Sequence, residues 1–206
     1  MIMNFYQLAI KIVRHIFFLF NGPTQVQGLE NLPKEGPYII AATHRSLYDP
    51  FYLAIVWAPE EISFMAKNSL FKWKWLGYLL TKAHVFPVNR EKPSPKTLKF
   101  AVKQLEQGFH LGIFPSGTRH STEIKSGTAF IQRLSKKAIV PVAIQPPLTK
   151  WQFLKRQPAK IAIGPAINYD PQATYDKAKL EQIDQAIANA FDELDQKIDP
   201  QFHYDP

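Results

Sequence analysis

Short apolar runs alternate with longer amphipathic stretches along most of the chain after Gly22. The short runs have the length and the β-branched content of buried strands, whereas the longer stretches have helical periodicity. We expect strands at residues 38–42, 62–66, 84–88, 111–114, 139–144 and 160–163, and helices at residues 50–57, 95–107, 128–136 and 171–198. This order predicts an α/β fold with a central, largely parallel mixed sheet that is flanked by helices.

The first twenty residues have a different pattern. Their longest uninterrupted apolar run covers only residues 16–20, which is too short to cross a bilayer. At about 100° per residue, the polar side chains fall on one stripe and the apolar side chains on another face. The polar stripe holds Asn4, Gln7, Lys11, Arg14 and His15, and the apolar face holds Phe5, Leu8, Ile12, Ile16 and Leu19. This pattern predicts an amphipathic helix, which can lie in a lipid headgroup layer or pack against the domain.

The length of 206 residues is enough for one continuous hydrophobic core. We therefore expect two units: a membrane-associating amphipathic helix at residues 1–22 and a single domain at residues 23–206. Within the domain, Pro146 and Pro147 precede a stretch of cations and aromatic residues at 150–156, for which we expect an exposed loop.

The positive charge is concentrated in the first part of the chain. The net charge is +8 overall, but it is +14 for residues 1–160 and −6 for residues 161–206. A basic body favours an anionic partner, such as nucleic acid, acidic lipid headgroups, a phosphorylated substrate or an acidic carrier protein. The chain has no cysteine, which excludes a cysteine nucleophile and a thiolate zinc site.

A histidine and an aspartate follow the first expected strand. In α/β sheets, functional side chains gather just beyond the carboxyl ends of the strands. His44 and Asp49 can meet there if the residues between them form a loop, and we expect Asp49 to be the N-cap of a helix that begins at Pro50. A carboxylate on one imidazole nitrogen leaves the other nitrogen free to accept a proton. The pair is therefore a candidate general-base dyad, although Asp49 as a helix cap alone would explain the same residues.

Cations follow three further expected strands. Lys67 ends the strand at 62–66, and Arg90 follows the strand at 84–88. The strand at 111–114 leads into Gly117, Thr118 and Arg119, where a glycine allows close approach of a ligand and an arginine offers paired donors to phosphate. Three cations and the His44 pair are thus expected at one edge of the sheet.

Taken together, these motifs resemble the glycerolipid acyltransferase family, which includes the 1-acylglycerol-3-phosphate (lysophosphatidic acid) acyltransferases. Its first block, a histidine, four residues and an aspartate, matches His44 to Asp49, with Thr43 where the family often has asparagine. The second resembles the segment from 67 through 77 to 90. The third, usually Phe-Pro-Glu-Gly-Thr-Arg, is present at 114–119 with Ser116 in place of glutamate. The fourth, a hydrophobic Val-Pro run, is similar to residues 139–142.

The resemblance implies an enzyme of phospholipid biosynthesis that moves a fatty acyl group to the free hydroxyl of lysophosphatidic acid. His44, held by Asp49, would deprotonate that hydroxyl, which attacks the thioester of acyl-CoA or acyl carrier protein directly. Lys67, Arg90 and Arg119 would bind the acceptor phosphate, and backbone donors near Gly117 and Thr118 would assist. The resemblance implies no metal and no cofactor, and a peripheral enzyme at the cytoplasmic face of the cell membrane.

Other functions remain open at the level of sequence. A nucleic-acid-binding module would also be basic and aromatic, but it leaves the His44 and Asp49 pair unexplained, so we expect no nucleic-acid partner. A non-catalytic lipid-binding protein would keep the amphipathic helix and the basic surface. Within the family, another lysophospholipid or an aminolipid is an alternative acceptor. The aromatic and basic stretch at residues 71–80 fits an acyl tunnel, a bilayer interface or a partly buried helix.

Overall fold

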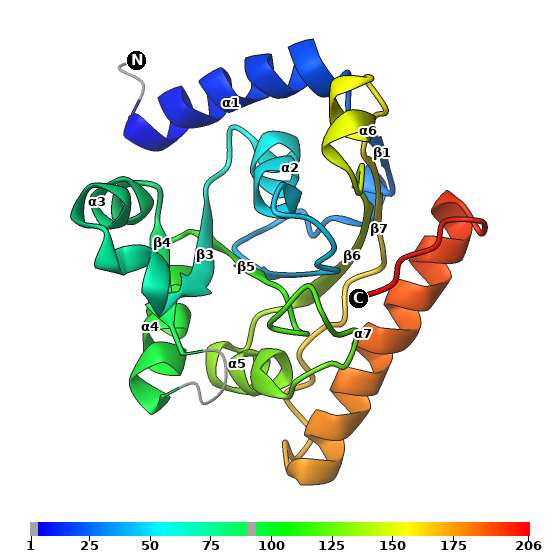
Figure 1. Cartoon of the computed structure of the whole chain (residues 1–206). Coiled ribbons are helices and arrows are strands. Elements are labelled where there is room, and N and C mark those ends of the chain that lie inside the picture. Colours follow the sequence, from blue (N-terminus) through cyan, green and yellow to red (C-terminus); the bar gives the residue numbers. More distant parts are fainter. Residues whose placement is uncertain (1–3, 90–93) are drawn as a thin grey trace.

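The computed structural model describes residues 4–89 and 94–206, and within these ranges a seven-stranded sheet forms the centre of the molecule (Figure 1). The strands lie in the order β1-β7-β6-β2-β5-β3-β4, and only the pairing of β6 with β7 is antiparallel. Their bounds are β1 Gln25–Gln27, β2 Ile39–Ala42, β3 Ile62–Lys67, β4 Val85–Val88, β5 His110–Ile113, β6 Ile139–Gln145 and β7 Lys160–Ile163. The expected α/β fold with a largely parallel mixed sheet is confirmed.

Helices cover both faces of this sheet (Figure 1). One face is covered by α1 Phe5–Asn21, α2 Asp49–Trp57 and α6 Lys150–Leu154, and the other by α4 Pro95–Glu106, α5 Gly127–Ser135 and α7 Lys177–Ile198. The short 3-10 helix η1 Leu29–Asn31 follows β1, whereas η2 Asn68–Lys72 and α3 Lys74–Lys82 connect β3 to β4 at one edge.

The central strand β2 shows why the sheet is buried on both faces. Ile40 and Ala42 pack into the core beneath α1 and α2, whereas Ile39 and Ala41 pack against the side chains of α4, α5 and α7. All four residues are at most 1% exposed. A parallel strand with helices on both faces has this continuous apolar sequence, and its carboxyl end delivers the chain directly to Thr43 and His44.

Several elements differ from the expectations. β1 was not predicted, because it is a three-residue edge strand with one apolar side chain, Val26. The stretch at 150–156 is not simply a loop: Thr149 caps the short helix α6 through a bond from the Gln152 N–H to its hydroxyl. The last helix begins at Lys177 instead of residue 171, because the Asp176 carboxylate accepts the Lys179 N–H and so fixes the helix start.

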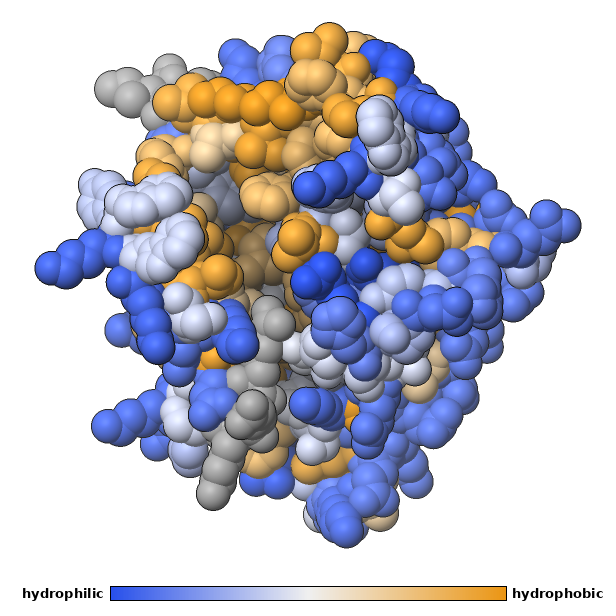
Figure 2. Space-filling view, viewed as in Figure 1, coloured by the Kyte–Doolittle hydropathy of each residue, from blue (hydrophilic) through white to orange (hydrophobic). Residues whose placement is uncertain are grey.

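The N-terminal helix is present, and two of its faces are apolar, one buried and one exposed. Tyr6, Ile10 and Phe17 are buried against the domain. The opposite face carries the apolar stripe predicted from the sequence, which we call the outer stripe: Phe5, Leu8, Ile12, Ile16 and Leu19. These side chains are 41% to 62% exposed, and Figure 2 shows the apolar surface along α1. No helix within the described residues is long and apolar enough to cross a membrane.

Two bonds fasten α1 to the helix that begins at the candidate dyad. The Arg14 guanidinium donates to the Ile55 carbonyl over 2.7 Å, and the Tyr52 hydroxyl donates to the Asn21 side-chain oxygen over 2.6 Å. Burial raises the pKa of Tyr52, so its hydroxyl stays protonated and available as a donor at neutral pH. Arg14, which the sequence placed in the basic polar stripe of the helix, therefore also binds the main chain of α2.

Candidate active site

His44 and Asp49 meet at the carboxyl end of β2. The distance from His44 Nδ1 to Asp49 Oδ2 is 3.0 Å, with the His44 side chain 8% exposed and that of Asp49 fully buried. The same Asp49 oxygen accepts the backbone N–H groups of Arg45 and Ser46, over 2.6 and 2.7 Å. Because a carboxylate oxygen only accepts, Nδ1 carries the proton, and the imidazole can take up a further proton at Nε2.

The predicted cap role of Asp49 is wrong. Tyr48 occupies the N-cap position of α2, Asp49 is the first helical residue and Pro50 lies within the first turn. The carboxylate of Asp49 turns back to the loop that precedes the helix, where it meets His44 and two amides that the loop leaves unpaired. Its negative charge still lies at the positive end of the helix dipole. The carboxylate thus holds the loop in shape and orients the histidine at once.

Aromatic rings fix the other side of the imidazole. The Phe114 ring stacks on His44 with a centroid distance of 4.2 Å and an interplanar angle of 24°. Phe64 lies beyond it, at a centroid distance of 6.4 Å from Phe114. Gly112 makes room for this arrangement, since a Cβ at this position would lie 2.3 Å from the Phe64 ring. The imidazole therefore has its ring plane set by packing and its Nδ1 set by Asp49.

The turn after β5 is closed by its own hydrogen bonds. Gly117 adopts a φ of 68° and donates its N–H to the Phe114 carbonyl over 2.8 Å. Ser116, in the position where the family motif has glutamate, is 6% exposed and donates to the Thr118 carbonyl over 2.8 Å. The Thr118 hydroxyl accepts the His120 N–H over 3.2 Å. The Gly117 N–H, expected from the sequence to assist substrate binding, is therefore already engaged.

The cations expected at this edge lie at the ends of neighbouring strands. Lys67 is the last residue of β3 and is exposed, whereas Arg119 lies in the turn after the adjacent strand β5 and is half-buried. Arg90 lies outside the described residues. Sequence reasoning missed Lys125, whose ammonium lies 3.7 Å from the position that a Cβ on Gly117 would occupy. Within residues 4–89 and 94–206, no carboxylate forms an ion pair with Lys125.

A cavity of about 440 Å³ opens beside the carboxyl ends of β2 and β5, which we call the catalytic edge because it holds the candidate dyad. One end is polar and holds His44, Gly117 and Lys125. The remainder is mainly apolar and is lined by side chains on the face covered by α4, α5 and α7, including Met65, Leu98, Ile113, Phe130, Ile131 and Leu180. Ligand cavities of this size, with apolar walls and a few polar groups at one end, suit a molecule that has a long apolar part and a small reactive head.

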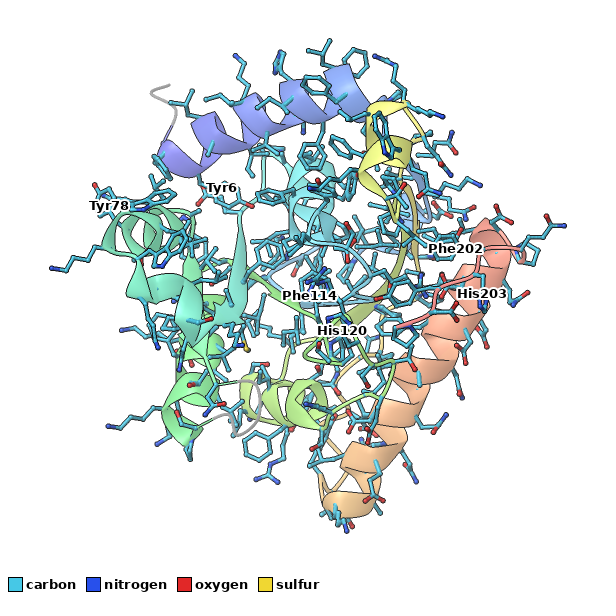
Figure 3. The ribbon with its side chains drawn as sticks, in the orientation of Figure 1. Tyr6, Tyr78, Phe114, His120, Phe202 and His203 are labelled. Atoms are coloured by element: carbon cyan, nitrogen blue, oxygen red, sulfur yellow. The ribbon has the colours of Figure 1, made fainter. Side chains whose placement is uncertain are left out.

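A second, more polar cavity of about 200 Å³ also borders His44. It is lined by His44, Arg45 and Ser116 from the sheet edge, and by Asp195 and Tyr204 from the C-terminal part of the chain. Its walls thus bring the two catalytic-edge loops together with residues about 80 to 160 positions further along the chain. Figure 3 shows Phe114 and His120 near the centre of this edge, with Phe202 and His203 beside α7.

Comparison with known proteins agrees with the family resemblance seen in the sequence motifs. A family model described as acyltransferase matches residues 23–145, which include the dyad, Lys67 and Arg119. A 1-acyl-sn-glycerol-3-phosphate acyltransferase of Bacillus subtilis is 36% identical over 194 residues, covering 93% of this chain and 96% of the relative. An enzyme of the same name from Streptococcus pneumoniae is 30% identical and covers 98% of this chain and 76% of the relative.

The fold is also similar to a solved structure. The crystal structure of the 1-acyl-sn-glycerophosphate acyltransferase of Thermotoga maritima superimposes with a TM-score of 0.68 and 22% sequence identity. The match covers 92% of this chain and 79% of the other. This likeness extends the agreement to the arrangement of the sheet and its helices.

Proposed function

The chain belongs to the acyltransferase family, and from this premise we propose that it acylates the free hydroxyl of lysophosphatidic acid in phospholipid biosynthesis. The observation that carries the proposal is the His44 and Asp49 dyad at the mouth of a largely apolar cavity. The names of the relatives supply the acceptor, and the cations around the dyad suit its phosphate.

In this mechanism, His44 Nε2 takes the proton of the acceptor hydroxyl as its oxygen bonds to the thioester carbonyl carbon. Collapse of the tetrahedral intermediate breaks the carbon–sulfur bond, and the thiolate leaves with the proton from the imidazolium. Asp49 stabilises the positive imidazolium in between, since its buried carboxylate faces Nδ1. The acyl chain occupies the apolar part of the 440 Å³ cavity, which brings its carbonyl to the polar end.

The acceptor phosphate is bound by Lys67, Arg90 and Arg119, to which we add Lys125. Lys125 lies at the polar end of the cavity, next to Gly117 and with no ion-pair partner among the described residues. Because the Gly117 N–H bonds the Phe114 carbonyl, Lys125 is also the better candidate for stabilising the developing oxyanion. Thr118 shapes this turn through its hydroxyl and its carbonyl.

A panel of acceptors and donors tests the proposed function. Purified protein is given lysophosphatidic acid, lysophosphatidylcholine, an aminolipid or monoacylglycerol, each with acyl-CoA or acyl carrier protein, and products are identified by mass spectrometry. We expect phosphatidic acid to form fastest, with one donor or both. Faster acylation of a different lysolipid would replace the acceptor, and no product with any pair would favour a non-catalytic lipid-binding protein.

The enzyme acts as a peripheral protein at the cytoplasmic face of the cell membrane, with α1 as its contact. The outer stripe of α1 points away from the domain and is exposed, so the helix need not unfold or detach to meet lipid. Trp73, Trp75 and Tyr78, around the start of α3, are each more than 60% exposed, and amphipathic rings of this kind favour a bilayer interface.

Replacing Ile12 and Ile16 together by glutamine should weaken binding to anionic liposomes by about tenfold or more. Each isoleucine contributes at most roughly 1.5 to 3 kcal/mol when fully buried in an apolar phase. Cosedimentation and thermal unfolding measure binding and stability. The matched control replaces Phe100 and Leu134, which are also exposed but belong to the helix layer on the opposite face of the sheet. Equal binding by the two double variants would exclude α1 as the contact.

A further inference from the structure

The C-terminal segment after α7 runs beside the catalytic edge and contacts both loops of the candidate site. Phe202 and Tyr204 place their rings on the Arg45 guanidinium, with distances of 5.3 and 5.7 Å from its central carbon to the ring centroids. The Tyr204 hydroxyl also donates to the Arg119 carbonyl. A single tyrosine thus contacts the residue that follows the general base and the residue proposed to bind the acceptor phosphate.

Arg45 transmits this contact to the dyad. Its side chain is only 10% exposed, and its guanidinium forms a two-point ion pair with Asp195 of α7, with the first nitrogen 2.7 Å from a carboxylate oxygen. The same nitrogen donates to the Ile144 carbonyl over 2.8 Å. On the main chain, the Arg45 N–H donates to the Asp49 oxygen that also orients His44. Movement of the Arg45 side chain would therefore disturb the hydrogen bonds that orient the base.

Among residues 4–89 and 94–206, the Arg119 side of the contact has little other support from distant segments. The bonds of Ser116, Gly117 and Thr118 hold the turn together internally. The stacking of Phe114 on His44 fixes the start of the turn but acts five residues before Arg119. The Tyr204 hydroxyl, in contrast, reaches Arg119 from a separate segment 85 residues away along the chain.

We propose that Tyr204 is a positioning residue for acyl transfer, which sets the distance between the general base and the phosphate-binding arginine by linking their two loops. The inference rests on the proposed function. Charge-assisted bonds to phosphate depend on where the guanidinium is held, so a loosened Arg119 loop should weaken binding of the phosphate-bearing acceptor. Burial raises the pKa of the Tyr204 hydroxyl above its ordinary value, so the group stays protonated at neutral pH and keeps its role as donor.

The test separates the two contacts of Tyr204. Tyr204→Phe keeps the ring on Arg45 and removes only the bond to Arg119, so we expect a KM for lysophosphatidic acid about tenfold higher, with kcat nearly unchanged. Transfer to monoacylglycerol, which has no phosphate, should be unaffected. Tyr204→Ala also removes the ring, so kcat should fall with both acceptors. The matched control is His203→Ala, because this neighbouring side chain is 82% exposed and its ion pair is with Asp205.

A double variant gives a further arm to this test. In an Arg119→Ala background, Tyr204→Phe should have no additional effect on KM, because the guanidinium that it positions is gone. Additive effects, equal losses with both acceptors, or a loss that follows a lower melting temperature would each overturn the inference. If wild type makes no phosphatidic acid, the proposed function fails. If wild type is active and Tyr204→Phe behaves like His203→Ala, only the role of Tyr204 fails.

Discussion

His44→Ala should lower the turnover of acyl transfer by about 100-fold or more while the protein remains folded. Positioned general bases contribute roughly 10² to 10⁴-fold in rate, and the proposed mechanism assigns removal of the acceptor hydroxyl proton to the His44 imidazole. The loss should appear in kcat and kcat/KM together, since the proton transfer occurs only in the transition state. Steady-state kinetics with circular dichroism on the same samples measures both properties.

Asp49→Asn should be nearly as damaging to turnover. The asparagine side chain keeps the size of Asp49 but cannot stabilise the imidazolium or accept from His44, Arg45 and Ser46 as a full negative charge does. His120→Ala is the matched control, because His120 is an exposed histidine in the loop after β5. Retention of more than about a tenth of wild-type turnover by His44→Ala would rule out this histidine as the general base.

Arg119→Ala should cost on the order of 2 to 4 kcal/mol in transition-state binding of lysophosphatidic acid. The arginine offers forked donors that suit a phosphate, and the loss of one charge-assisted partner leaves that anion poorly compensated. Monoacylglycerol should be a poor substrate for wild type and should lose little more in the variant. The ratio of kcat/KM for the two acceptors is therefore the quantity to measure.

Variants of other cations test whether the loss depends on the acceptor phosphate. Lys67→Ala and Arg90→Ala should show the same preference for loss with the phosphate-bearing acceptor. Lys103→Ala removes an exposed cation of α4 and should change neither acceptor. If the site variants reduce transfer to both acceptors by the same factor, these cations hold the donor or the fold, and the acceptor phosphate loses its proposed partners.

The sequence was most informative where local pattern and burial coincide. The run at β2 is apolar on both faces because helices cover both sides of it, so its strand character and its position before His44 could be predicted. The spacing of His44 and Asp49 also allowed their contact to be predicted. The sequence could not show that the Asp49 carboxylate turns back to the amides of Arg45 and Ser46. The expected helix cap was wrong for that reason.

Contacts between distant segments left no local signal. Tyr204 reaches Arg119 across 85 residues, and nothing in the periodicity near the C-terminus indicates it. Lys125 was missed because it follows the family motif without belonging to it, although its nearness to Gly117 is plain in the fold. The amphipathic pattern of α1 predicted its apolar stripe correctly, but the burial of Tyr6 and Phe17 on a different face depended on the surface of the folded domain.

The attachment of α1 to α2 links the N-terminal helix to the element that begins at the proposed dyad. Arg14 and Asn21 hold the two helices together, and the first residue of α2 is Asp49. In the proposed membrane-bound state, α1 settles in lipid at a depth determined by its apolar stripe, so its attachment to α2 would also set the height of the His44 imidazole relative to the acyl chains. The protein would then select acceptors by how far below the headgroup plane their hydroxyl lies, in addition to the charge that they carry.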